Sequence, residues 1–333
     1  MARVRAWAAG VLAAALGASA AGCSSTGGKR AEEAGQHGAG GRAAVNTPRW
    51  DVAMVTHSGQ GDTFWDVVRK GAEQAAVKDN IHFTYSASPE ASEQAQLVQN
   101  AIDRKVDGLV VTLAKPDAMK SVVRKAVDAG IPVITINSGA EDSKRFGALA
   151  HFGQDEEIAG EAAGEQLNKD HRKHALCVLH EQGNVGHEAR CAGAAKTFKG
   201  TMDKLYVEGT NMPSVESSLQ AKLTAQKSID AVLTLGAPYG DAAVRAKKSA
   251  GSGAEVATFD LNAEVARGLG DRTLAFAVDQ QQYLQGYEAV DQLWLYRYNG
   301  NVLGGGRPVL TGPQILTERD ATHLKKFAER GTR

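Results

Sequence analysis

The sequence has no excess of charge of either sign. Its 38 Lys and Arg residues balance 38 Asp and Glu residues, so the formal net charge is zero. Proteins that bind nucleic acid by neutralising phosphates carry clustered positive charge, and a neutral chain is a poor candidate for that class. We therefore expect no nucleic-acid partner.

Hydrophobic residues are too few for a bundle of membrane helices. They make up 43% of the chain, which is enough for a buried core. The uncharged apolar run over residues 6–18 is shorter than the roughly 20 residues that cross a bilayer, so a transmembrane anchor is not expected there.

Motifs for catalysis are also lacking. The chain has no GxxxxGK[ST] phosphate loop and no GxSxG nucleophile motif, and the GxG in residues 57–62 lacks the third glycine of a dinucleotide fingerprint. Four histidines cluster in sequence without HExxH spacing, and exposed polar side chains are the simpler interpretation of them: His171, His174, His180 and His187. We expect a protein that is not an enzyme, with no cofactor and no metal.

The first 22 residues have the features of an export signal. Arg3 and Arg5 precede the apolar run, and small residues lead to Cys23. This end resembles the lipobox of bacterial lipoproteins, although Ala20 stands where Leu is usual. We expect a signal peptide over residues 1–22 and a lipid on Cys23, with plain secretion as the alternative.

Residues 24–48 are rich in Gly, Ala and Ser and show no periodicity. With Cys23 they predict a flexible tether over residues 23–48. The chain from residue 49 onward is near the size at which one hydrophobic core divides in two, so we expect two lobes.

Cysteine is rare, with three residues in the chain. If Cys23 carries the lipid, Cys177 and Cys191 remain, and both belong to an exported domain in which disulfides persist. Cys177 lies in an apolar strand-like run and Cys191 early in the next helix-like run. We expect a disulfide between them that closes a strand–helix turn; two small buried thiols are the alternative.

From Trp50 onward, short apolar runs alternate with amphipathic runs. The pattern predicts strands over 51–56, 81–85, 107–112, 131–137, 174–180, 204–209, 230–236, 254–260 and 273–279. It predicts helices over 63–77, 91–103, 117–129, 156–169, 187–199, 214–226, 240–250, 262–269, 282–298 and 320–329. Continuous apolar strands alternating with helices indicate an α/β fold with parallel sheets and right-handed crossovers.

Amides, carboxylates and two aromatic residues follow the carboxyl ends of several predicted strands. They are Asp62, Phe64, Trp65, Asn137, Ser138, Gly139, Gln154, Asp155, Glu156, Asp260, Asp279, Gln280 and Gln281. Ligands of α/β proteins bind at this edge of the sheet. Sugars need this combination, because their hydroxyls bond to carboxylates and amides and their apolar faces stack on aromatic rings. Helix capping is the alternative role for Asp62 and Asp155.

Several segments together resemble the ribose-type periplasmic sugar-binding proteins, the substrate-binding lipoproteins of ABC transporters (periplasmic binding protein class I). The segments are DVAMVTHSGQGDTFWDVVRKGAE, VDGLVVTLAKPDAM, AGIPVITINSG, GQDEEIAGEAAGE, ATFDLN and FAVDQQQYLQGYEAV. The resemblance implies two Rossmann-like lobes joined by three hinge crossings, with the sugar in the cleft. The implied lobes are residues 49–153 with 281–311, and residues 154–280 with 312–333.

The resemblance also implies ligand-binding residues. In this chain they are Asp62, Phe64, Trp65, Asn137, Ser138, Glu188, Arg190, Asp260 and Gln280, to which the strand-end pattern adds Gln154 and Asp155. Asn137 and Ser138 stand where relatives commonly have Asp-Arg, and Gly236 and Ala237 where they often have Asn-Asp. The ligand is therefore expected to be a monosaccharide or a related polyol or cyclitol.

The function implied is a monomeric, extracytoplasmic lipoprotein anchored to the cell membrane. It captures a sugar or polyol and delivers it to the permease subunits of an ABC transporter. A receptor of the same fold that feeds a signalling system is the alternative.

The lipid anchor leads to a first testable prediction. Cys23→Ala removes the acceptor sulfur, so the protein is expected to be released from the membrane or to remain unprocessed. Membrane fractionation and mass spectrometry of the N-terminus measure both outcomes. A Cys23→Ala protein that stays membrane-bound and is cleaved at the same site would show that Cys23 is not the anchor.

Overall fold

The computed structural model describes residues 45–59 and 62–333. The predicted signal peptide, Cys23 and most of the predicted tether lie outside these residues. None of the helices in the described ranges has both the length and the apolar character of a membrane span.

The first sheet contains six strands, and all of its neighbouring strands are parallel. Their order is β11-β5-β4-β3-β1-β2. The strands are β1 (Asp51–Thr56), β2 (His82–Ala87), β3 (Gly108–Thr112), β4 (Val133–Ile136), β5 (Ala150–Gly153) and β11 (Val309–Leu310).

The second sheet repeats this arrangement, in the order β12-β10-β9-β8-β6-β7. Its strands are β6 (His174–Leu179), β7 (Thr201–Tyr206), β8 (Ala231–Thr234), β9 (Glu255–Phe259), β10 (Ala277–Asp279) and β12 (Gln314–Leu316). Only β12, at one edge, is antiparallel to its neighbour within the described sheet. The predicted α/β fold with two parallel-sheet lobes is confirmed.

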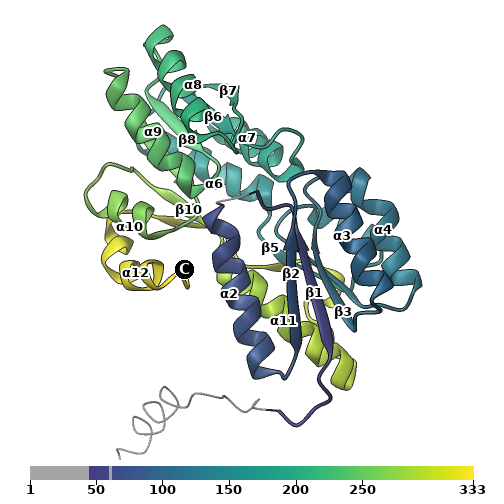
Figure 1. Cartoon of the computed structure of the whole chain (residues 1–333). Coiled ribbons are helices and arrows are strands. Elements are labelled where there is room, and N and C mark those ends of the chain that lie inside the picture. Colours follow the sequence, from purple (N-terminus) through teal and green to yellow (C-terminus); the bar gives the residue numbers. More distant parts are fainter. Residues whose placement is uncertain (1–44, 60–61) are drawn as a thin grey trace, which may run out of the picture. The chain divides into compact units, whose positions relative to one another are not determined.

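Helices connect the strands and cover the sheets (Figure 1). They are α2 (Thr63–Lys78), α3 (Ala91–Asp103), α4 (Pro116–Asp128), α5 (Ala140–Arg145), α6 (Glu156–Lys169), α7 (Val185–Thr197), α8 (Met212–Ala225), α9 (Ala237–Ser249), α10 (Ala263–Gly270), α11 (Gln282–Asn299) and α12 (Glu318–Arg330), with the short 3₁₀ helix η1 (Gly304–Gly306).

Two predicted strands differ from the structure, and one short helix was not predicted. The strand predicted over 204–209 corresponds to β7, which begins three residues earlier. β7 is a partly exposed edge strand, and the polar residues at its start do not form the apolar run from which strands were predicted. The strand predicted over 273–279 is shortened to β10, since the backbone N–H of Leu274 bonds back to the carbonyl of Gly268 in a turn. Helix α5 was not predicted, because its six residues are too few for a helical pattern.

Both faces of each sheet are buried. In β1, Val52 and Met54 pack in the cluster under α2 and α11, whereas Ala53 and Val55 pack in the cluster under α3 and α4. In the second sheet, the side chains of β6 alternate in the same way. One set packs in a hydrophobic cluster with α6 and α7, and the other set packs in a cluster with α8 and α9. This burial explains why the strands are continuous apolar runs.

The chain passes between the two halves three times: between β5 and α6, between β10 and α11, and between β11 and β12. The lobe boundaries given above by residue number stay a prediction.

Glycines let two helix pairs pack closely beside the strand ends. A Cβ on Gly71 of α2 would lie 2.0 Å from the carbonyl oxygen of Tyr283 in α11. A Cβ on Gly160 of α6 would lie 2.1 Å from the carbonyl oxygen of Arg190 in α7. Only glycine allows these backbones to approach so closely, and the second contact places Arg190 against α6.

A disulfide joins Cys177 in β6 to Cys191 in α7, with a Cα–Cα distance of 6.0 Å. Both residues are fully buried in the cluster beneath α6 and α7. The bridge therefore ties the middle of α7 to β6, which lies next to the edge strand β7 of the second sheet.

Removing this bridge tests its contribution. The double variant Cys177→Ala/Cys191→Ala is expected to lower the free energy of unfolding by about 3 kcal/mol, because the unfolded chain is no longer closed into a loop of about 15 residues. Urea unfolding measures the change, with reduced wild-type protein as the control. Labelling of both thiols in denatured, unreduced wild-type protein would contradict the bridge.

Candidate functional site

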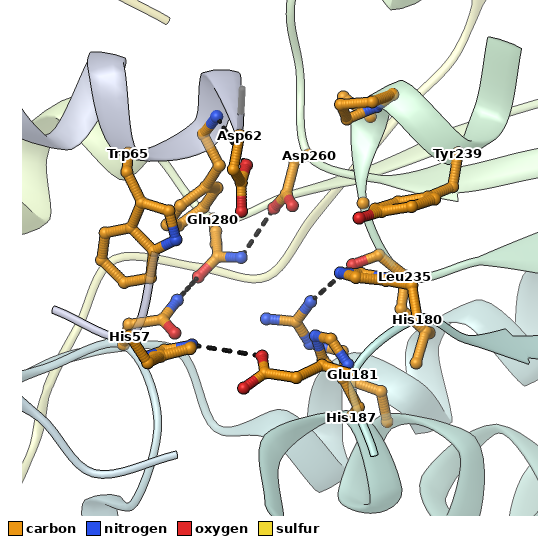
Figure 2. Close-up of a pocket in the computed structure, with 16 residues that line it drawn as sticks. His57, Asp62, Trp65, His180, Glu181, His187, Leu235, Tyr239, Asp260 and Gln280 are labelled. Atoms are coloured by element: carbon orange, nitrogen blue, oxygen red, sulfur yellow. Dashed lines mark hydrogen bonds and ion pairs between the residues drawn. The ribbon is translucent and has the colours of Figure 1, made fainter. Parts of the chain in front are cut away.

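A cavity lies where the carboxyl ends of strands from both sheets meet (Figure 2). It has about 400 Å³ of empty space, part of it open to solvent. Six lining residues each come directly after the last residue of a strand: His57 (β1), Asn137 (β4), His180 (β6), Leu235 (β8), Asp260 (β9) and Gln280 (β10).

Aromatic rings from the start of α2 form the first-lobe wall. Phe64 and Trp65 both line the cavity and meet edge to face, with ring centroids 4.9 Å apart. Trp65 also meets His57 edge to face at 4.9 Å. Asp62 caps α2 by accepting a hydrogen bond from the backbone N–H of Phe64 at 3.1 Å, and it lines the cavity as well. Capping and cavity lining are thus combined in one residue.

A chain of side-chain hydrogen bonds joins the strand ends of the two sheets. Asn137 Nδ2 donates to Gln280 Oε1 at 3.1 Å, and Gln280 Nε2 donates to Asp260 Oδ1 at 2.6 Å (Figure 2). Gln285 Nε2 also donates to Gln280 Oε1, at 2.8 Å. All three members of the chain were predicted as site residues, and they are 5% exposed or less.

The backbone is strained at the same strand ends. Asn137 has φ +63°, Asp260 has φ +69° and Gln281 has φ +54°. Left-handed backbone is uncommon for residues other than glycine, and such strain is concentrated at functional sites. It turns the chain sharply at the ends of β4 and β9, where the side chains of Asn137 and Asp260 line the cavity.

Arg190 forms a buried, two-pronged ion pair with Glu156. Its Nε donates to Glu156 Oε2 at 2.6 Å and its Nη2 to Glu156 Oε1 at 2.9 Å. Nη1 donates to the carbonyl of Leu235 at 3.0 Å, and the guanidinium lies 4.7 Å from the ring centre of Phe259. Burial alone would lower the pKa of Arg190, but Glu156 outweighs it and the pKa is raised.

Two carboxyl groups of the cavity are hard to ionise. Burial raises the pKa of Asp260 to about 7, against the opposing attraction of Arg190 and the hydrogen bond from Gln280. Burial also raises the pKa of Asp62 to about 6, although the hydrogen bond from Phe64 opposes it. Each carboxylate lacks the solvation that a ligand hydroxyl could restore.

Two of the four clustered histidines, His180 and His187, line the cavity, which corrects the expectation that they are exposed; His171 is exposed as expected. His187 is 7% exposed and His57 is 8% exposed, and both line the cavity with His180. Burial lowers the pKa of His180 to about 3 and holds that of His187 well below its usual value. These rings are therefore neutral at neutral pH.

Glu181 contacts side chains from the opposite sheet. The hydroxyl oxygen of Thr112 accepts hydrogen bonds from Gln94 and from the backbone N–H of His57. The hydroxyl hydrogen of Thr112 is therefore available to His57 Nδ1, which lies 2.8 Å from the hydroxyl oxygen. Nε2 of the same ring lies 3.6 Å from Glu181 Oε2 and 3.5 Å from Asn184 Nδ2. Lys115 Nζ lies 3.8 Å from the other oxygen of Glu181.

Seven predicted site residues line this cavity: Asp62, Phe64, Trp65, Asn137, Arg190, Asp260 and Gln280. Ser138 is buried beside it and donates to Asn137 Oδ1 at 2.9 Å. Gln154 and Asp155 line a different hollow, where the Asp155 side chain caps α6 through Ile158 N.

Glu188 is not brought to the cavity, because it lies on a partly exposed face and bonds to Lys204 and Tyr206.

The sequence did not single out His57, Glu181, Leu235, Pro238 or Tyr239, and it did not place His180 and His187 in the site. The rule applied to Asn137 and Asp260, that ligand contacts follow strand ends, also covers His57, His180 and Leu235. Tyr239 stands third in α9 and had no comparable signal.

Comparisons with known proteins agree with this geometry. A carbohydrate transporter from Acidothermus cellulolyticus, solved in complex with myo-inositol, is 49% identical, with a TM-score of 0.85; the match covers 86% of this chain and all of that one. The ribose import binding protein of Escherichia coli is 25% identical over 75% of this chain and 87% of its own length. The xylose/arabinose-binding protein of Sulfolobus acidocaldarius is 22% identical over 75% of this chain and 66% of its own length.

The family model described as the periplasmic binding protein domain matches residues 52–299, which contain most of both sheets and every residue that lines the cavity. The resemblance inferred from the sequence motifs is confirmed, and the chain belongs to the periplasmic binding protein family.

Proposed function

We propose that the chain binds a neutral cyclic polyol, a monosaccharide or a cyclitol, in this cavity and delivers it to an ABC permease. The observation that carries the proposal is the pairing of two aromatic rings on one lobe with a buried chain of amide and carboxylate groups that joins both lobes. Rings pack against the C–H faces of a polyol, and amides and carboxylates bond to its hydroxyls.

The names of similar proteins support this ligand class. The Acidothermus protein was solved with myo-inositol, and a structural neighbour from Burkholderia graminis, which shows a shared fold at 22% identity, was solved with D-arabinose. Because the protein solved with myo-inositol is the more similar of the two, we take myo-inositol as the first ligand to test. The curated relatives are named as import and binding proteins, which favours transport over the sensing alternative.

Each proposed contact has a separate chemical task. Phe64 and Trp65 cover an apolar face of the ligand. Asp260 accepts hydrogen bonds from hydroxyls, while Gln280 holds Asp260 in place. Arg190 remains charged through Glu156 and can donate to a hydroxyl oxygen beside Asp260.

Contacts between the lobes support ligand capture by closure. The backbone N–H of Val185 bonds to the carbonyl of Ala114 at 3.1 Å, and Glu181 faces Lys115 and His57. A ligand that touches both lobes binds the closed arrangement better than an open one and so shifts the population toward it. A lipid on Cys23 would keep this receptor beside its permease.

Binding itself tests the proposal. Wild-type protein is titrated calorimetrically with myo-inositol, D-ribose, D-xylose and D-glucose, and at least one is expected to bind. Asp260→Ala is then expected to weaken binding about ten- to several-hundred-fold, because hydroxyls lose their partner in a closed site at about 1–3 kcal/mol. Gln280→Ala is expected to weaken it as well.

Asp155→Ala is the matched control, since it removes a helix cap outside the cavity. It is expected to lower stability by about 1 kcal/mol and to leave affinity unchanged. Unchanged affinity in both cavity variants would refute the proposed contacts, and a wild-type protein that binds no member of a wider sugar and cyclitol panel would refute the ligand class.

Asp260 also leads to a prediction about pH. Because its pKa is about 7 in the folded protein and near 3.9 in unfolded chains, the folded state favours the protonated form, and this contribution to stability is lost as the pH rises through 7. The amide of Asp260→Asn cannot ionise, so ligand-free Asp260→Asn is expected to unfold at a higher temperature than wild type at pH 8, with the difference gone by about pH 4.

Thermal unfolding at pH 4, 6 and 8 measures this effect. Asp128→Asn, at an exposed position at the end of α4, is the control and should show no such trend. A variant that is less stable than wild type at pH 8 would show that the charge of Asp260 stabilises the empty site.

A further inference from the structure

Three rings lie together along the second-lobe wall of the cavity. His180 is stacked on Tyr239, with ring centres 3.8 Å apart and an interplanar angle of 19°. His187 packs against His180 at a tilt of 55°, with ring centres 4.2 Å apart. We call His187, His180 and Tyr239 the ring column; Figure 2 shows these rings on the same side of the cavity, opposite Trp65.

The column is held from α9 and from the loop after β7. Tyr239 donates its hydroxyl hydrogen to the carbonyl of Gly209 at 3.2 Å. A Cβ on Gly236 would lie 3.2 Å from both His180 Cε1 and Tyr239 Cδ2, so a larger residue there would press on the stack. The ring of His180 is therefore confined by its neighbours.

This packing decides how His180 can contact a ligand. Tyr239 covers one face of the ring and His187 packs closely against it at a tilt, so the ring edge, which carries the nitrogens that hydrogen-bond, is the part we expect a ligand to meet. The aromatic rings of Phe64 and Trp65 serve a different purpose, because they belong to the apolar wall opposite.

Both histidines of the column have an unused nitrogen. Among the described residues, no partner bonds to Nδ1 of His180 or Nδ1 of His187, although both atoms are shut off from solvent. A buried polar atom without a partner is costly, and its retention requires an explanation. Because both Nδ1 atoms are closed to solvent, a polyol seated in the cavity would meet these rings at the other edge nitrogen, Nε2.

The surroundings keep these rings neutral. Arg190 adds positive charge nearby, and this opposes protonation together with burial. A nitrogen of a neutral imidazole either donates or accepts, depending on the tautomer, and a hydroxyl can serve as the partner in both cases. This wall therefore suits a hydroxyl and disfavours an ammonium group.

We propose that His180 and His187 are ligand-contacting residues that bond edge-on to hydroxyls of the polyol, and that Tyr239 is a positioning residue that holds His180 in this orientation. This proposal rests on the proposed function and adds the basis of ligand specificity. The ligand carries neighbouring hydroxyls on the side that faces the ring column, and an analogue that lacks one of these hydroxyls binds more weakly.

The test measures by calorimetry how wild type and variants bind myo-inositol and its mono-deoxy analogues. His180→Phe and His187→Phe keep a ring in the column but remove its nitrogens, and each is expected to weaken myo-inositol binding about 10- to 100-fold. Wild type should bind one deoxy analogue more weakly than myo-inositol by a similar factor. The variant that lacks the histidine contacting the missing hydroxyl should bind this analogue and myo-inositol with equal affinity.

Tyr239 is tested by a conservative and a disruptive change. Tyr239→Phe preserves the stack and is expected to change affinity less than threefold, whereas Tyr239→Ala should weaken binding at least tenfold. The ¹⁵N signals of the His180 and His187 rings should shift on addition of myo-inositol in wild type. In Tyr239→Ala the His180 shift should be reduced, which a loss of general stability would not produce.

His323→Phe, on an exposed face of α12, is the control for the histidine substitutions. Circular dichroism melts verify that each variant is folded. If wild type binds myo-inositol but both His→Phe variants retain its affinity and its discrimination, the ring column does not contact the ligand and the inference is wrong. If wild type binds no sugar or cyclitol, the proposed function fails instead.

Discussion

The buried ion pair between Glu156 and Arg190 is the interaction on which the site depends. It joins the start of α6 to α7, and through Nη1 it also holds the carbonyl of Leu235 at the end of β8. Removing either partner would leave an uncompensated charge in a nearly dry cavity, which typically costs about 3–5 kcal/mol. Because Arg190 remains charged, Asp260 has a nearby positive partner in a place where burial alone would neutralise it.

The ligand-free cavity maintains several unfavourable features at once. Left-handed backbone at Asn137 and Asp260, carboxyl groups with raised pKa values and histidine nitrogens without partners all occur in one place. Each lowers stability in the empty protein, and the carboxyl groups are the ones to which ligand hydroxyls can restore hydrogen bonds. Strain and incomplete solvation of this kind are typical of sites that are preorganised for a ligand and supported by a stable framework.

The framework and part of the site follow rules that can be read along the chain. Apolar strand runs predicted the sheets, because both faces of the strands are buried. Polar residues directly after those runs predicted Asn137, Asp260 and Gln280, since parallel strands end at a common edge. The same rule was not applied to His57, and it missed His180 because that residue was weighed as a metal ligand and not as a neutral hydrogen-bonding ring. Glu188 was misplaced because it lies two residues from Arg190 on α7 and therefore points to a different face of the helix.

The sequence by itself determined the α/β architecture, the two cysteines that can pair and the residues that stand at strand ends, because these depend on local periodicity and neighbouring residues. Only the tertiary structure decided which of those residues share one cavity. Asn137 and Gln280 are 143 positions apart and meet because two sheets face each other at their carboxyl ends. The stacking of Tyr239 on His180 and the charge of Arg190 beside Glu156 likewise depend on packing between elements and on the exclusion of water, which no local pattern in the chain records.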